Sequence, residues 1–184
     1  MKTLSYEQRG PKICFVGDIV PDRIYHLDPN LKNYILNHDI RLFNLEGAFS
    51  VDRKPLFKAG RHLLLDTECF TPFSECFNVA VLANNHSMDF SAEGLAATQS
   101  LCMAKGMQTV GAGKNIQEAY TPLDVAHCRI IALAENEFGA AGENSPGIAV
   151  VDDTRRILSM IREGCRCGKI VIIVAHGGTE MIPI

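Results

Sequence analysis

Several short runs in this chain contain only apolar residues, so a β-strand formed by such a run would be apolar on both faces. This feature constrains the fold more than any other. The most hydrophobic run covers residues 170–174, and shorter runs cover 13–16 and 79–82. A strand that is apolar on both faces is typical of a parallel sheet covered by helices on both sides. Segments with a helical pattern separate these runs, so the sequence predicts an α/β fold.

We expect strands and helices to alternate along a single domain of 184 residues. Helix N-caps are expected at Asp28, at Ser91 and at Asp152 or Asp153. Residues 48–66 are expected to form a long loop or a small hairpin, and residues 139–147 a glycine-rich loop. The expected helices cover residues 28–37, 67–77, 91–105, 116–120 and 152–163. The expected strands cover residues 12–16, 40–43, 79–82, 107–110, 123–126, 129–133 and 170–174, with a turn at His127-Cys128.

Composition argues against several classes of protein. The net charge of −3 gives no basic footprint for nucleic acid. No run approaches the roughly 18 apolar residues that a membrane span needs, and the polar N-terminus does not resemble a signal peptide. We therefore expect a cytoplasmic protein, in which the seven cysteines are free thiols.

Polar side chains follow four of the predicted strands. Because parallel strands end at the same edge of a sheet, ligands of α/β proteins bind there, and these side chains are expected to meet on one rim. They are Asp18 after the first strand, Asn44 and Glu46 after the second, Asn84, Asn85 and His86 after the third, and His176 and Glu180 after the last.

Carboxylate, amide and imidazole groups together suit Mn²⁺, Fe²⁺ or Zn²⁺, as one ion or as a pair. An imidazole that binds no metal can protonate a leaving oxygen, and His86 is the candidate for this catalytic role. We predict metal ligands at Asp18, Glu46, Asn85 and His176, with Asn44, Asn84 and Glu180 as additional candidates.

Each residue also has a structural interpretation. Asp18 alone could cap a turn, Glu46 could be solvated, Asn84 or Asn85 could occupy a left-handed turn, and His176 could bond a loop carbonyl. Glu135 and Glu137 could reach the rim, although a solvated loop is the favoured interpretation of residues 135–137. Four strand ends with the same chemistry favour the shared site.

Five short motifs occur in order along the chain: Gly17-Asp18, Asn44-Leu45-Glu46-Gly47, Ala83-Asn84-Asn85-His86-Ser87-Met88-Asp89, Gly111-Ala112-Gly113 and His176-Gly177-Gly178-Thr179-Glu180. Together they resemble the CapA-type capsule (poly-γ-glutamate) synthesis family of the calcineurin-like metallophosphoesterase superfamily. The resemblance implies a four-layer α/β/β/α sandwich with metal ligands at Asp18, Glu46, Asn85 and His176, and with His86 near the leaving group.

The chain departs from the family pattern at three points. Ile19 and Val20 follow Asp18, where the superfamily has Asp-x-His, and Gly177 stands where relatives have a large residue. The chain also stops before the Gly-His-Pro-His segment, so we expect the sandwich to lack its C-terminal strands. A strand edge exposed in this way invites pairing with a second copy, and we expect a homodimer or reduced stability.

Two functions follow from these observations. The first is a metal-dependent hydrolase in capsule or poly-γ-glutamate biosynthesis that acts on an anionic polymer or a phosphate ester. The second is a non-catalytic module that binds an anionic polymer or helps a capsule synthase complex to assemble. The missing imidazole and C-terminal ligands favour the second, and a fragment without activity of its own is a third interpretation.

Overall fold

Four parallel strands form the first sheet, which carries most of the residues predicted for the rim. The structure is a computed structural model that describes residues 10–58 and 60–178. The strand order in this sheet is β1-β2-β3-β4, and every neighbouring pair is parallel. The strands are β1 (Ile13–Ile19), β2 (Ile40–Leu45), β3 (Val79–Val81) and β4 (Gln108–Val110). The connections between them contain α1 (Pro29–Leu36), α2 (Thr67–Ser74) and α3 (Ser91–Ala104).

The second sheet has the strand order β6-β7-β9. β6 (Leu123–Val125) and β7 (Cys128–Ala134) form an antiparallel hairpin, and β7 is parallel to β9 (Ile170–His176). The pairing of β7 with β9 ends at Ala134 and His176, so both strands finish at the same edge. Helix α5 (Thr154–Arg166) connects them, and the small elements α4 (Ile116–Ala119), β5 (Ala112–Gly113) and β8 (Gly147–Ile148) complete the fold.

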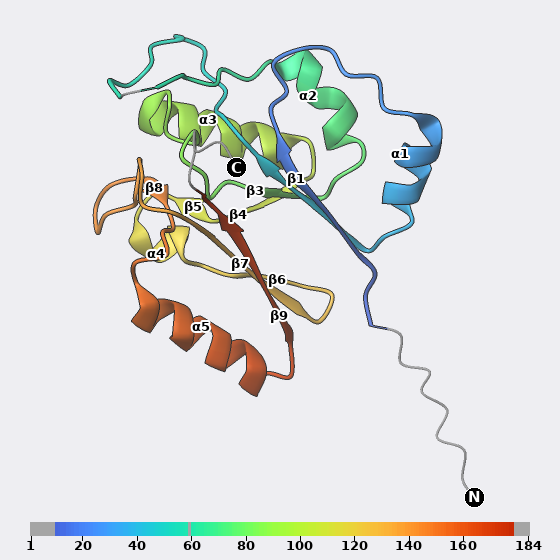
Figure 1. Cartoon of the computed structure of the whole chain (residues 1–184), viewed down its shortest axis with the longest axis vertical. Helices are drawn as coiled ribbons and strands as arrows, with labels where there is room; N and C mark the ends of the chain where they lie inside the picture. The colour runs from blue at the N-terminus through green and yellow to red at the C-terminus, as the bar shows by residue number, and fades with distance from the viewer. Residues whose placement is uncertain (1–9, 59, 179–184) are drawn as a thin grey trace, which may run out of the picture.

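β7 is buried along its whole length because its two faces contact two different groups of apolar side chains. Ile130 belongs to the main core, which also contains Leu42 of the first sheet. Ile131 belongs to a smaller core with Met160 of α5. Figure 1 shows α2 and α3 on the outer side of the first sheet and α5 on the outer side of the second. The predicted α/β class is therefore confirmed.

Local signals placed most elements correctly, with small corrections. Asp28 caps α1 and Asp153 caps α5, as expected. The predicted cap at Ser91 is wrong, since Phe90 occupies that position and no side chain caps α3. The predicted turn at His127-Cys128 lies one residue too late, because Ala126 and His127 take positive φ values of 45° and 66°. Cys128 already pairs with Val125, so the hairpin closes one residue earlier.

β9 lies at the edge of its sheet, and part of its apolar run is exposed to solvent. The expectation that this run is covered on both faces is therefore wrong. Ile170 and Ile173 are 51% and 49% exposed. β1 occupies the edge of the other sheet, and its Phe15 is 52% exposed. Within the described residues, no strand pairs with the outer edge of β1 or β9. Pairing of such an edge with a second copy stays a prediction.

Candidate metal site

Asp18 lies inside β1 rather than after it, and an irregularity in the strand sets its direction. The register between β1 and β2 shifts between Val16 and Asp18, so Gly17 is an extra residue. A bulge of this kind bends the strand and changes the direction of the side chains beside it. Asp18 then pairs with Asn44 of β2, and Asp18 Oδ1 accepts a hydrogen bond of 2.7 Å from Asn44 Nδ2.

Asn84 is fully buried behind this pair. Its Nδ2 donates to Asn44 Oδ1 at 3.1 Å and to the Leu45 carbonyl at 2.9 Å. Its Oδ1 accepts from the His86 backbone N–H and from Ser87 Oγ, both at 3.1 Å. Because both ends of this amide have partners within the protein, Asn84 orients Asn44 and the turn that carries His86.

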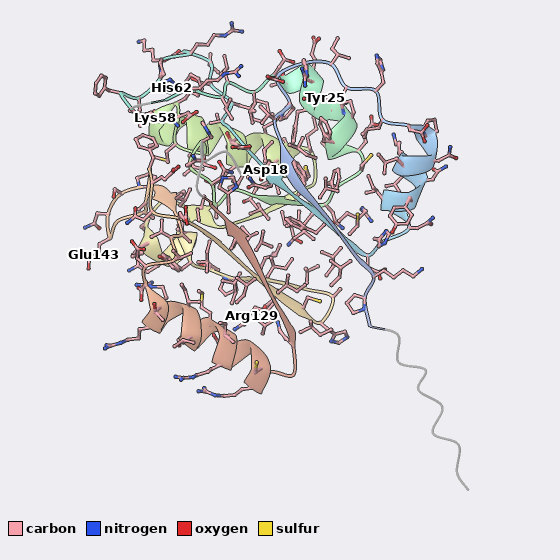
Figure 2. All side chains as sticks on the ribbon, in the orientation of Figure 1. Asp18, Tyr25, Lys58, His62, Arg129 and Glu143 are labelled. Carbon is pink, nitrogen blue, oxygen red and sulfur yellow. The ribbon has the colours of Figure 1, made fainter. Side chains whose placement is uncertain are left out.

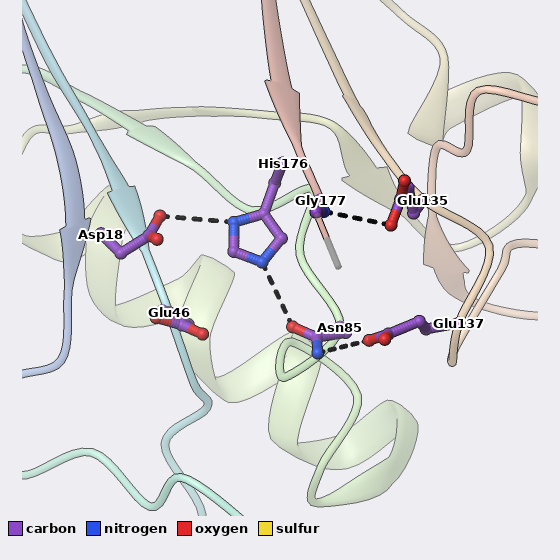
Figure 3. A pocket seen from close by; sticks show the side chains of 8 residues that line it. Asp18, Glu46, Asn85, Glu135, Glu137, His176 and Gly177 are labelled. Atoms are coloured by element: carbon purple, nitrogen blue, oxygen red, sulfur yellow. Dashed lines mark hydrogen bonds and ion pairs between the residues drawn. The ribbon is translucent and has the colours of Figure 1, made fainter. Parts of the chain in front are cut away.

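His176 ends β9 and brings the second sheet to the same place. Its Nδ1 lies 3.1 Å from Asn44 Nδ2 and 3.3 Å from Asp18 Oδ1. Its Nε2 lies 3.2 Å from Asn85 Oδ1. A neutral ring protonated at Nε2 donates to Asn85 and accepts from Asn44, so one tautomer satisfies both amides. Figure 3 shows the imidazole between Asp18 and Asn85.

These side chains line a pocket of about 250 Å³. Four carboxylates contribute to its wall, whereas none of the described residues that line it is a lysine or an arginine. Such a concentration of negative charge favours a cationic occupant. The lining residues are Asp18, Glu46, Asn85, Glu135, Glu137, His176, Gly177 and Gly178.

Glu135 and Glu137 reach the pocket from the segment after β7. Both residues are exposed, as a solvated loop predicts, but their side chains line the pocket. Glu137 Oε2 accepts from Asn85 Nδ2 at 2.6 Å, and Glu135 Oε2 accepts from the Gly178 N–H at 3.1 Å. A Cβ atom on Gly177 would lie 2.5 Å from Glu135 Cγ, so glycine at this position leaves room for the carboxylate. The signal for both residues was their position after a strand that ends beside β9.

His86 lies beside the pocket and is oriented by Asp89. Its Nδ1 is 2.8 Å from Asp89 Oδ2, and its Nε2 faces Glu46 Oε1 at 3.9 Å. The Asp89 side chain is fully buried and also contacts the Lys58 ammonium. Burial alone would raise the pKa of Asp89, but hydrogen bonds from His86, Lys58 and the Leu63 N–H lower that pKa below its usual value.

The four residues predicted as metal ligands therefore line one pocket, and His86 adjoins it. Asn44 and Asn84 are buried and hydrogen-bonded to each other, and neither lines the pocket. Glu180 lies outside the described residues. Within residues 10–58 and 60–178, no three His, Cys, Asp or Glu side chains are arranged as a metal-binding group, and metal binding stays a prediction.

Comparison with known proteins identifies the family. Residues 12–183 match the family described as "Bacterial capsule synthesis protein PGA_cap". The chain belongs to this family. The resemblance to CapA-type proteins found in the sequence motifs is thereby confirmed.

Two PGA_cap relatives illustrate the likeness. The "PGA biosynthesis protein CapA" of Bacillus subtilis (strain 168) is 28% identical over 111 residues, which cover 56% of this chain and 29% of that protein. A "Probable polyglutamine synthesis accessory protein" of Mycobacterium tuberculosis (strain ATCC 25618 / H37Rv) is 30% identical over 164 residues, which cover 77% of this chain and 42% of that protein. The chain thus spans less than half the length of these relatives. In the part that the structure describes, none of the helices has the length and apolar character needed to cross a bilayer.

Proposed function

We propose that this PGA_cap chain binds a divalent cation in its pocket and acts in capsule or poly-γ-glutamate synthesis as a metal-dependent hydrolase of phosphate esters. The observation that carries the proposal is the convergence of Asp18, Asn85 and His176, which come from β1, from the turn after β3 and from the end of β9. Local structure alone gives no reason for these side chains to meet. The description of the family, which names capsule synthesis, and the names of the relatives, which refer to PGA biosynthesis and polyglutamine synthesis, support this setting.

The donor atoms in the pocket fit a divalent cation in their chemistry. Carboxylate oxygens, the Asn85 amide oxygen and the His176 imidazole suit Mn²⁺, Fe²⁺ or Zn²⁺. Asp18, Glu46, Asn85 and His176 would hold the ion, and Glu135 and Glu137 line the same pocket. A bound cation would supply Lewis-acid polarisation of a phosphoryl oxygen.

The residues around the proposed metal ligands orient side chains or transfer a proton. Asn44 and Asn84 hold Asp18 and His176 in place through the buried amide network. Asp89 fixes the Nδ1 side of His86, so that Nε2 faces Glu46 at the pocket wall. From this position His86 is placed to deliver a proton to a leaving oxygen.

The family assignment also leads us to propose the four-layer α/β/β/α architecture of metallophosphoesterases for the whole protein. Two packed sheets with helices on their outer sides support this assignment (Figure 1). A cytoplasmic location is likewise kept as a proposal.

Calorimetric titration with Mn²⁺ and Zn²⁺, together with hydrolysis of p-nitrophenyl phosphate, tests this function. We expect Asp18→Ala and His176→Ala to abolish both metal binding and turnover. Asp52→Ala changes an exposed carboxylate of the segment after β2 that does not line the pocket, and it serves as a matched control that behaves as wild type. Full activity in both pocket variants would refute the proposal.

A second candidate is a non-catalytic module that binds an anionic polymer or supports assembly of a synthase complex. Two observations favour it: Ile19 and Val20 supply no imidazole after Asp18, and the described residues contain no three-residue metal-binding group. Poly-γ-glutamate binding measured with and without EDTA separates the candidates. Without a metal ion, the carboxylates of the pocket repel a polyanion. Poly-γ-glutamate that still binds in the presence of EDTA must therefore bind to another surface, and this result would support the non-catalytic module.

A further inference from the structure

Lys58 is a buried cation beside the acidic pocket. It lies in the segment between β2 and α2, and Figure 2 labels it on the loop at the α3 side of the molecule. Only 8% of its side chain is exposed, and its ammonium forms an ion pair with the fully buried carboxylate of Asp89. Lysine is rarely buried to this degree unless it has a partner, so the position demands an explanation.

The ammonium contacts the turn that carries the predicted ligand and the predicted proton donor. Lys58 Nζ donates to the Asn85 backbone carbonyl at 3.2 Å and lies 3.3 Å from His86 Nδ1. The same ammonium contacts Asp89, whose other oxygen holds His86. One side chain from a distant loop therefore contacts residues 85, 86 and 89 of the turn.

Lys58 also contacts a third segment, the one after β7. Its ammonium lies 5.1 Å from the centre of the Phe138 ring, which is within the range of a cation–π interaction. Phe138 follows Glu137, whose carboxylate accepts from the Asn85 side chain at 2.6 Å. Asn85 is thus held from two directions, at its carbonyl by Lys58 and at its amide by Glu137.

We propose that Lys58 is a positioning residue of the pocket, which fixes Asn85 and His86 relative to Glu137. This inference rests on the proposed function, because it assigns Lys58 a role in presenting the Asn85 oxygen to a cation. Lys58 is not among the residues that line the pocket, and it acts on them through its contacts with the turn. Its cationic head instead joins three segments that each carry a pocket residue: Glu46, Asn85 and Glu137.

The experiment compares Lys58→Met with Lys54→Met, which removes an exposed lysine from the same loop. Mn²⁺ affinity is measured by calorimetry, and hydrogen–deuterium exchange is followed at residues 84–90. We expect Lys58→Met to weaken Mn²⁺ binding by about tenfold, a typical loss for a residue that orients a ligand. Lys54→Met should match wild type, and Lys58→Arg should recover part of the affinity because it keeps the charge.

A folded Lys58→Met variant that binds Mn²⁺ as tightly as wild type overturns the inference. Lys58→Met leaves the buried Asp89 carboxylate without its ammonium partner. If that variant does not fold, the double variant Lys58→Met with Asp89→Asn removes this charge, and Mn²⁺ binding as tight as in wild type again overturns the inference. If wild type itself binds neither Mn²⁺ nor Zn²⁺, the proposed function fails, and exchange then decides the inference alone. Faster exchange at residues 84–90 in Lys58→Met supports the positioning role, and unchanged exchange rejects it.

Discussion

Changing Asn84 to aspartate tests whether the buried amide network holds the site together. The substitution leaves the volume almost unchanged but replaces Nδ2 by an oxygen. That oxygen then faces Asn44 Oδ1 and the Leu45 carbonyl, which now accept from Nδ2 at 3.1 and 2.9 Å. Each buried acceptor that loses its donor costs about 1–3 kcal/mol, so the expected loss of unfolding free energy is about 2–6 kcal/mol. A domain of this size is stable by only about 5–15 kcal/mol, so the effect is large.

Urea unfolding followed by circular dichroism at pH 5 and pH 8 measures this loss. Burial raises the folded-state pKa of the introduced carboxyl above its unfolded value of about 3.9. The unfolded chain then releases its proton at lower pH than the folded chain does. The variant should therefore lose stability relative to wild type as pH rises above about 4, and the loss should be larger at pH 8.

Asn33→Asp, at an exposed position of α1, is the control. It should change the unfolding free energy by no more than about 0.5 kcal/mol. A loss below about 1 kcal/mol for Asn84→Asp at both pH values contradicts the assigned network, because two unpaired buried acceptors cannot cost so little.

Three further outcomes are expected. Gly177→Ala should displace the Glu135 carboxylate, since the added Cβ would lie 2.5 Å from Glu135 Cγ. Calorimetry should therefore show weaker Mn²⁺ binding for Gly177→Ala than for Gly178→Ala, where an added Cβ meets nothing within 4 Å. Hydrogen bonds from Arg129 hold the pKa of Asp124 well below its usual value, so their stabilisation is present above about pH 4 and is lost on acidification. Asp124→Asn should therefore flatten the acid side of a stability–pH curve and, at this partly exposed site, cost about 1 kcal/mol at pH 7 in urea unfolding. Phe70→Ala, at a fully buried position, should lower the unfolding free energy by about 3–5 kcal/mol in the same assay.

Short-range chemistry explains why so many elements were predictable. The pair Asp28-Pro29 begins α1 because the aspartate accepts from Asn30 and Leu31 and the proline suits the first helical turn. The run at 170–174 forms most of β9, since β-branched residues favour extended backbone. The meeting of Asp18 with Asn44 was also predictable, because polar residues near the ends of neighbouring parallel strands share an edge. His176 was predicted on the same rim, but it reaches Asp18 from the second sheet, through packing that the edge rule does not cover.

Other features depend on which segments become neighbours, and a pattern along one chain does not encode this. The apolar sequence of β9 does not indicate that this strand lies at the edge of its sheet, where Ile173 is half exposed. Glu137 looks like any loop carboxylate until β7 ends beside β9 and brings it to Asn85.

Lys58 belongs to the same group, because its partner Asp89 is distant in sequence and in another loop. Local backbone preferences and the pattern of polar and apolar residues determine the helices and strands, and they show which strand ends carry polar side chains. The identity of the charges that meet there follows from long-range packing, since a buried ion is stable only where folding supplies its partner.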